Sequence, residues 1–318
     1  MHNYSGEQCL LCLGNDVEVS RAQMISGVAY RIVFCERCGV GTTIPVPDDE
    51  TLAVLYSTQY YRNGEGARFT VPVEWLVEGM RKWRVCRLSK FVRKGRMLDV
   101  GCGSGRFLRA MRAAGWQVAG LELNDDTAIS ARNIHGLVVE TSLDSYKGQS
   151  FDLITITHVL EHIRDPYKML KDCARLLDGG GVLAIAVPNI KSWQAQLTRN
   201  YWFHLDLPRH LWHFSEKWLS TTLAELGFEQ VSVRRLDLAH NIFGWLQSLM
   251  NILRLPQNRM YSLLSSDDLD VGCKGSYCSL AALCVLLPIL LIVSVVLALV
   301  EVLFHAGGTV EIIARIKK

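Results

Sequence analysis

The stretch GRMLDVGCGSGRFLRAMRAAGW, residues 95–116, decides the fold. Residues 97–100 have the apolar character of a short buried strand, and glycines at 101, 103 and 105 allow a tight turn. A helix is predicted from Phe107 to Ala114. Glycines let the backbone pass close beneath a ligand, and a helix N-terminus favours an anionic group there. The stretch therefore predicts a nucleotide-type loop between a strand and a helix.

An acidic residue strengthens this interpretation. The next predicted strand, WQVAGLEL (residues 116–123), carries Glu122 near its end, at the distance where an acid commonly binds ribose hydroxyls. A generic strand–turn–helix is the alternative, but Glu122 and Asp99, two residues before the first glycine, argue against it. The glycines follow G-x-G-x-G, whereas a dinucleotide fingerprint reads G-x-G-x-x-G. The pattern therefore favours a different cofactor.

The segment LDVGCGSG (residues 98–105) resembles motif I of the class I S-adenosylmethionine-dependent methyltransferases. The resemblance continues through Glu122 and covers about residues 96–238. Its further segments are SFDLITITHVLEHIRDPYKML (150–170), ARLLDGGGVLAIAVPN (174–189) and LPRHLWHFSEKWLSTTLAELGFEQVSV (207–233). Within this class, the sequence resembles the methyltransferase-23 group. The resemblance implies an α/β, Rossmann-like fold with a seven-stranded sheet. The implied activity is methyl transfer from S-adenosyl-L-methionine.

The same resemblance assigns residues around the cofactor. Glu122 would hold the ribose, and Ser142 and Leu143 would lie near the adenine. His158, after the fourth strand, would face the sulfonium. The methionine part would be bordered by Asp99, Gly101, Gly103 and Gly105.

Histidines are the candidate bases. The sulfonium already activates the methyl group, so transfer needs positioning of the acceptor and, for a hydroxyl, removal of its proton. Histidine suits this role because its ordinary pKa is about 6.5. We expect the loop HLDLPRHLWHF (residues 204–214) to form one wall of the acceptor pocket. His210 is the preferred base, His158 the second and His162 a further candidate, whereas a structural role is equally expected for His213.

A second metal is a separate hypothesis. If a helix begins where the fourth strand ends, His158, Glu161 and His162 share one face and could converge on one divalent ion. This arrangement is similar to the Glu-x-x-Glu-His metal site of quinone-ring O-methyltransferases, with His158 in place of the first Glu. The alternative is that Glu161 and His162 only orient the helix.

Four N-terminal cysteines predict structural zinc. Cys9 and Cys12, and then Cys35 and Cys38, form two CxxC pairs that flank a possible hairpin with a turn near Gly27. Four thiolates complete a closed tetrahedral zinc shell, and a module of this size needs such support. The sequence contains ten cysteines and begins without a basic and apolar leader, so we expect reduced thiols and the cytosol.

Between the zinc ribbon and the glycine loop we expect a linker and then a helix within VEWLVEGMRKWRVCRLSKFVRKG (residues 73–95). Its apolar residues recur at helical spacing, which predicts a face packed on the sheet. These residues are Trp75, Leu76, Met80, Trp83, Leu88, Phe91 and Val92.

The run SLAALCVLLPILLIVSVVLALV (residues 279–300) carries no charge and is long enough to cross a bilayer. However, GGTVEIIARIKK (residues 307–318) is the only later candidate for the seventh strand beside FEQVSVRRLDL. A single crossing would separate these two strands, so it is rejected. A hairpin bent at Pro288 that dips into one leaflet, or one long helix in the interface, is expected. A buried core or dimer contact is the alternative.

The predicted organisation has five parts: a zinc ribbon (1–45), a linker with an N-terminal helix (46–95), the methyltransferase core (96–238), an apolar helical insertion (239–306) and a closing strand (307–318). The net charge of +3 gives no reason to expect nucleic acid. We therefore expect a methyltransferase at the cytosolic membrane face, acting on a lipid-linked sugar, a prenylated quinone precursor or a similar amphiphile. Its rivals are a non-catalytic cofactor-binding scaffold and a C-methyltransferase acting on a soluble nucleotide sugar.

Overall fold

The protein is described by a computed structural model that covers residues 9–14, 17–25, 27–57, 71–235, 237–253 and 277–317. It divides into two compact units. The first comprises Met1–Pro47, Pro188–Glu216 and Arg234–Val310, and the second comprises Asp48–Val187, Lys217–Val233 and Glu311–Lys318. The five predicted segments are distributed over these two units, and their boundaries stay a prediction.

The second unit contains the seven-stranded sheet that the sequence predicts. Its order is β10-β11-β8-β7-β4-β5-β6, and the β4–β5, β4–β7, β5–β6 and β7–β8 pairs are parallel. The strands are β4 (Arg96–Val100), β5 (Gln117–Leu121), β6 (Val138–Glu140), β7 (Phe151–Thr157), β8 (Leu177–Pro188), β10 (Phe228–Arg234) and β11 (Thr309–Ile316). Because β4 is central, the loop that follows it lies where the strand order reverses, which is where open α/β sheets bind ligands.

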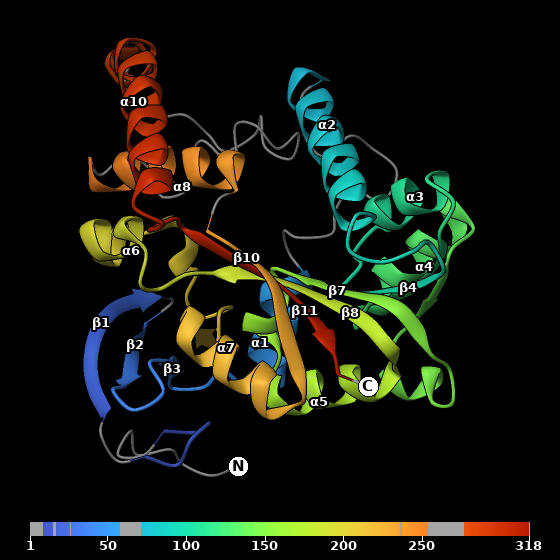
Figure 1. Cartoon of the computed structure of the whole chain (residues 1–318). Coiled ribbons are helices and arrows are strands. Elements are labelled where there is room, and N and C mark those ends of the chain that lie inside the picture. The colour runs from blue at the N-terminus through green and yellow to red at the C-terminus, as the bar shows by residue number, and fades with distance from the viewer. Residues whose placement is uncertain are drawn as a thin grey trace. The chain divides into compact units, whose positions relative to one another are not determined.

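The last strand completes the sheet between β8 and β10, as predicted from the sequence. The N–H of Asn189, just after β8, donates to the carbonyl of Gly308, just before β11 (2.9 Å). At the other end, the N–H of Lys317 donates to the carbonyl of Gly227, just before β10 (3.0 Å). The end of β8 thus lies beside the start of β11, and the start of β10 lies beside the end of β11. Strand β11 is therefore antiparallel to both neighbours, as the arrows in Figure 1 show.

Helices cover this sheet and supply its core. They are α1 (Asp49–Ser57), α2 (Val71–Leu88), α3 (Arg106–Ala113), α4 (Asp125–His135), α5 (Pro166–Leu176) and α7 (Glu216–Glu225), with 3-10 turns η1 (Leu143–Tyr146) and η2 (Leu160–His162). Asn124 and Asp165 cap α4 and α5 by accepting from backbone N–H groups one turn on. Met97, Leu108 and Leu153 are fully buried in one cluster, each worth roughly 1.5–3 kcal/mol.

Helix α2 forms where expected, and Leu88, with Phe91 and Val92 just after the helix, packs in the core as predicted, but the first part of the helix buries a different face. The predicted packing of Trp75, Leu76 and Trp83 is wrong, because these side chains are 77%, 62% and 53% exposed. Glu74 instead forms ion pairs with Arg81 and with Arg106 of α3. The inward stripe at the start of this helix is therefore charged, and only its end packs on apolar neighbours, through Val85 and Leu88.

The first unit contains a second sheet with the order β1-β2-β3-β9. Its strands are β1 (Val17–Ile25), β2 (Val28–Cys35), β3 (Gly41–Ile44) and β9 (Trp212–His213). The predicted hairpin is confirmed, since β1 and β2 pair antiparallel and Gly27 in the turn has φ 80°. The unit also contains α6 (Trp193–Thr198), α8 (Leu238–Ile252) and α10 (Tyr277–Leu303), with 3-10 turns η3 (Arg199–Tyr201) and η4 (Phe203–Leu205).

The apolar run forms one continuous helix, α10, with Pro288 inside it. The predicted hairpin bent at Pro288 is therefore wrong. The residues that flank the apolar insertion lie side by side. A Cβ atom on Gly307, just after it, would lie 1.7 Å from the carbonyl oxygen of Arg235, just before it. Residues 286–303 are long and apolar enough to cross a membrane, with mean hydropathy 2.9, and only 17% of them are buried.

Candidate functional site

The glycine loop after β4 has the backbone that its sequence requires. Gly101, Gly103 and Gly105 all have positive φ, at 73°, 53° and 76°. A Cβ atom on Gly101 would lie 2.3 Å from Val159, so only glycine fits there. A Cβ atom on Gly103 would meet nothing within 4 Å, so the middle of the loop faces open space.

Glu122 joins this loop to the end of β5. The side chain is buried, and its two oxygens accept from the N–H groups of Gly103 (2.9 Å) and Asn124 (3.1 Å). The N–H of Glu122 donates to the carbonyl of Glu140 at the end of β6 (2.9 Å). The Glu122 side chain thus joins the glycine loop, the start of α4 and the carboxyl end of β5.

Asp99 is the second buried carboxyl at this edge. It accepts a 2.5 Å hydrogen bond from the Thr155 hydroxyl on β7. Burial raises the pKa of Asp99 to about 6, although the Arg84 guanidinium and the Thr155 hydrogen bond oppose this shift. The carboxyl therefore changes charge near neutral pH.

Arg84, from α2, is the residue that the sequence analysis missed. Its guanidinium donates to the Thr157 hydroxyl and lies 4.4 Å from the ring centroid of Phe107, the second residue of α3. Its positive charge also lowers the pKa of Asp99 against the effect of burial. The signal in the sequence is the charged stripe of Glu74, Arg81 and Arg84 at helical spacing.

The three residues of the second-metal hypothesis do not share a helix. His158 directly follows β7 with φ 52°, a left-handed conformation that side chains rarely adopt, and α-helical structure is absent from residues 158–163. Glu161 and His162 lie in the 3-10 turn η2, and His158 Nδ1 is 3.6 Å from Glu161 Oε1. The expected i, i+3, i+4 face is therefore wrong, because a left-handed residue separates His158 from the turn.

Ser142 and Leu143 lie at the start of η1, which follows β6. The Ser142 hydroxyl accepts from the N–H of Asp144 at 3.3 Å and caps the turn. Their neighbour in the chain, Glu140, ends the strand that pairs with β5. The two residues are therefore near the carboxyl edge of the sheet, on the side of Glu122.

His210 lies in the loop of the first unit that leads to β9. It is 7% exposed, and its Nδ1 is 2.9 Å from the carbonyl oxygen of His204. A carbonyl only accepts, so Nδ1 carries the proton in the neutral ring and Nε2 is the atom that can take one up. Asp206 Oδ2 lies 3.8 Å from that Nε2. This is the tautomer that a general base needs.

The four N-terminal cysteines gather in the first unit. The sulfur atoms of Cys9, Cys12, Cys35 and Cys38 all lie within 4.8 Å of one another, with contacts of 3.5 and 3.6 Å. Tetrahedral zinc with Zn–S bonds of about 2.3 Å needs sulfur separations of roughly 3.8 Å. The Cys38 thiol lowers the pKa of Cys9 to about 5, so the cluster favours a thiolate.

The two CxxC turns have the same backbone. In each, the residue after the second cysteine has positive φ and donates its N–H to the carbonyl of the first cysteine: Leu13 to Cys9 at 3.0 Å, and Gly39 to Cys35 at 2.8 Å. The first cysteine in turn donates its N–H five residues on, to Gly14 or to Val40. Two equivalent turns presenting paired thiols fit one tetrahedral ion.

Comparisons with known proteins agree with the geometry of the second unit. Residues 77–233 match the family model described as a methyltransferase domain. Residues 77–233 are a methyltransferase domain. It belongs to the class I S-adenosylmethionine-dependent methyltransferases, as motif I and the strand order predict.

Several curated relatives match part of this chain. The chain is 36% identical over 111 residues to the ubiquinone biosynthesis O-methyltransferase of Idiomarina loihiensis. The match covers 31% of this chain and 45% of that protein. It is 37% identical over 105 residues to the protein of the same name from Xanthomonas oryzae pv. oryzae, covering 30% and 43%. The chain thus spans less than half the length of these relatives.

Among the solved structures to which this chain is similar is a SAM-dependent methyltransferase from Archaeoglobus fulgidus, which is 21% identical and has a TM-score of 0.44. The match covers 76% of this chain and 99% of that chain.

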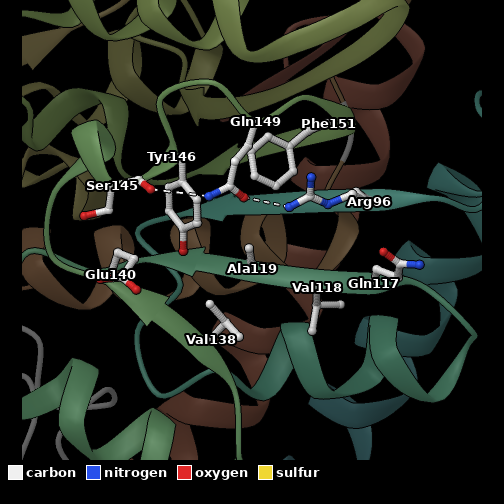
Figure 2. Close-up of a pocket in the computed structure, with 10 residues that line it drawn as sticks. All are labelled: Arg96, Gln117, Val118, Ala119, Val138, Glu140, Ser145, Tyr146, Gln149 and Phe151. Atoms are coloured by element: carbon white, nitrogen blue, oxygen red, sulfur yellow. Dashed lines mark hydrogen bonds between the residues drawn. The ribbon is translucent and has the colours of Figure 1, made fainter.

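The methyltransferase domain also contains a cavity of about 220 Å³ (Figure 2). Its lining includes the first residues of four parallel strands, Arg96, Gln117, Val138 and Phe151. The glycine loop follows the other end of β4. The cavity therefore lies at the amino edge of the sheet, where the Arg96 guanidinium donates to Gln149 at 2.7 Å.

Proposed function

We propose that this chain transfers a methyl group from S-adenosylmethionine to a hydroxyl of an amphiphilic small molecule, and that it works while attached to a membrane surface. The observation that carries the proposal is the pair of buried carboxylates, Asp99 and Glu122, beside the open backbone at Gly103. When bound, the cofactor supplies an electrophilic methyl group on a sulfonium centre.

The residues present fit that cofactor. Its ammonium and sulfonium are cationic, and the two carboxylates supply opposite charge in a buried setting where such pairing is strong. Its α-carboxylate needs a cation, and the Arg84 guanidinium, whose positive charge lowers the pKa of Asp99, can supply it. We therefore assign Asp99, Gly101, Gly103, Gly105 and Arg84 to the methionine part. Glu122 is assigned to the ribose, and Ser142 and Leu143 to the adenine.

We assign the proton of the acceptor hydroxyl to His210. The His204 carbonyl holds the Nδ1–H tautomer, which keeps Nε2 as the basic atom. Asp206, at 3.8 Å, would stabilise the imidazolium that forms. His158 is the second choice, supported by its rare left-handed backbone directly after β7, since such strain tends to persist at functional positions. His162 is the third.

The acceptor class follows from chemistry and from the relatives. Proteins named ubiquinone biosynthesis O-methyltransferase match about a third of this chain. A phenolic hydroxyl has a pKa of about 10, within reach of a histidine base when the methyl donor is already activated. A prenylated quinone precursor is therefore the first acceptor to test, and a lipid-linked sugar is the second.

Attachment to a membrane is supported by the distribution of side chains on α10, which buries polar side chains and exposes apolar ones. The side chains of Ser294, Ala298 and Glu301 are fully buried, whereas the outward positions are apolar. The outward side chains, all 45–75% exposed, are Ile289, Leu291, Ile292, Val296, Leu299 and Leu303. A helix of a soluble core shows the opposite distribution, so lipid is the proposed environment of its outer face.

We also propose that the four-cysteine cluster holds one structural zinc ion. The closed set of four sulfurs leaves no position for a substrate, which distinguishes it from a catalytic site. A zinc ion would join the turn before β1 to the turn between β2 and β3.

The experiment compares lipid and polar extracts of cells with and without the gene by untargeted mass spectrometry. The expected result is a lipid-soluble phenol or glycoside that gains one methylene mass only when the gene is present. His210→Gln should abolish the gain, whereas His305→Asn, at an exposed histidine with positive φ, should keep it. A methylated nucleotide sugar would instead support the C-methyltransferase alternative. Cofactor binding without any methylated product would support a scaffold.

A further inference from the structure

Thr43, in the zinc-ribbon strand β3, bridges two histidines of the loop that contains the proposed base. Its side chain is fully buried. The hydroxyl oxygen is 2.6 Å from the carbonyl oxygen of His210 and 3.0 Å from Nε2 of His213. A hydroxyl has one proton and a carbonyl can only accept, so the hydroxyl donates to His210. His213 must then donate from Nε2, which fixes its tautomer.

The backbone reinforces this bridge. Strands β3 and β9 pair antiparallel, with Gly41 opposite His213 and Thr42 opposite Trp212. The N–H of Thr43 donates to the carbonyl of Leu211 at 3.0 Å. A Cβ atom on Gly41 would lie 3.2 Å from the Cβ of His213, so the two strands are in close contact. The histidine loop therefore continues the ribbon's own sheet.

The second CxxC turn leads directly into β3. The N–H of Cys35 donates to the carbonyl of Val40, the residue before that strand, at 3.0 Å. A Cβ atom on Gly39 would lie 3.0 Å from the Ser215 hydroxyl, so the turn also abuts the chain just after β9. Any change in the geometry of Cys35 and Cys38 is thus transmitted into β3 over a few residues.

Apolar packing joins the ribbon to the same loop. Tyr30 and Ile32 of β2 form one buried cluster with Trp202, Leu205 and Leu207. One face of β2 is therefore covered by the chain that leads to His210. These contacts indicate that the ribbon supports the histidine loop structurally.

We propose that Thr43 is a positioning residue through which the cysteine cluster holds the backbone of His210 and the ring tautomer of His213, so that metal binding by the ribbon supports methyl transfer. The inference rests on the proposed function for the part that concerns the base. The Thr43 hydroxyl fixes the backbone of His210 and the ring of His213, and the His204 carbonyl fixes the ring of His210.

The test compares Thr43→Val, which keeps the shape and removes the hydroxyl, with Thr43→Ser, which keeps the hydroxyl. Nitrogen-15 spectra of the histidine rings are recorded on the full chain. We expect the wild type and Thr43→Ser to show His213 protonated at Nε2 and His210 at Nδ1. Thr43→Val should show mixed tautomers for His213. If Thr43→Val does not fold, Thr43→Ala is used in its place.

Activity provides the second measurement. We expect Thr43→Val to lower kcat about tenfold or more and to leave KM for S-adenosylmethionine within about twofold, because a base and not cofactor binding is disturbed. Thr43→Ser should restore most of the rate. Equal losses in both variants, or a change in KM alone, would show that Thr43 only stabilises the sheet and would overturn the proposal.

Loss of a cysteine ligand provides the third measurement. Cys38→Ser should shift the same His213 resonances as Thr43→Val, whereas Cys86→Ser, at an exposed cysteine outside the cluster, should not. If the wild type methylates nothing, the proposed function fails, but the ring spectra still decide the coupling. Unchanged His213 signals in both Thr43→Val and Cys38→Ser would overturn it.

Discussion

The carboxylate of Glu122 lies 2.9 Å from the N–H of Gly103 and thereby couples the end of β5 to the loop that follows β4. Its other oxygen accepts from Asn124, the cap of α4. One buried side chain therefore holds both the middle of the glycine loop and the start of a helix. Loss of its charge should disturb the loop as well as the ribose contact proposed for it.

Glu122→Gln should weaken binding of S-adenosylmethionine by about 10- to 100-fold, since hydrogen bonds to a charged group are worth roughly 1.5–3 kcal/mol. The amide keeps one acceptor but turns an NH2 group toward one of the two N–H donors. Isothermal titration with the demethylated cofactor measures the change. Glu140→Gln, at the end of the neighbouring strand, is the control. Equal affinities of the two variants would contradict the assignment of Glu122.

Asp99 should make the free energy of unfolding and the affinity for the cofactor change in opposite directions as the pH rises. Its pKa is raised from 3.8 to about 6 in the folded protein, so the folded state binds the proton more tightly than the unfolded state does. The resulting stabilisation is present at low pH and is lost as the pH rises from about 4 to 6, up to about 3 kcal/mol. Cofactor binding needs the carboxylate, so affinity should rise through the same range.

Asp99→Asn should remove both effects. Its unfolding free energy in the absence of cofactor should fall less than that of the wild type between pH 4 and pH 7, as measured by urea denaturation. Its cofactor affinity should be weak at every pH and show no rise near pH 6. Asp178→Asn, at an exposed position of β8, should behave like the wild type. A slope in Asp99→Asn equal to that of the wild type would assign the titration to another group.

The sheet could be predicted because its signals are local. Three glycines at alternate positions, an acid before them and Glu122 after the next strand determine a backbone that the structure reproduces at φ 53–76°. The closing strand could be predicted from topology, since residues 307–318 were the only remaining partner for the strand at 228–234. These features depend on neighbours in the chain or on a known strand order.

The inner face of α2 could not be predicted in the same way. Periodicity marks Trp75 and Trp83 as a stripe, but an ion pair between Glu74 and Arg106 of another helix decides which side faces the sheet. That choice depends on tertiary contacts. The same holds for His158, where a left-handed residue interrupts the expected helix, and for Pro288, which α10 tolerates inside its length.

Cys38→Ser should reduce the zinc content of the purified protein from about one ion per chain to well below half, because structural zinc needs four ligands. Inductively coupled plasma mass spectrometry measures this content directly. Cys86→Ser removes an exposed cysteine on α2 and should leave the zinc content unchanged. Zinc at the wild-type level in Cys38→Ser, or no zinc in the wild type, would refute the site.

Ile292→Glu should release the protein from membranes. Ile292 lies on the outer face of α10 and is 65% exposed, and burying a charged side chain in the acyl region of a leaflet costs about 2.5–3.5 kcal/mol at its most unfavourable depth. Flotation with liposomes that contain anionic lipid measures the bound fraction, which should fall severalfold. The matched control is Ile129→Glu, which changes a 48% exposed isoleucine on helix α4 of the methyltransferase domain. If both variants float like the wild type while a size measurement shows the Ile292→Glu chain dissociating from a dimer, the outer face of α10 binds another protein chain and the membrane proposal fails.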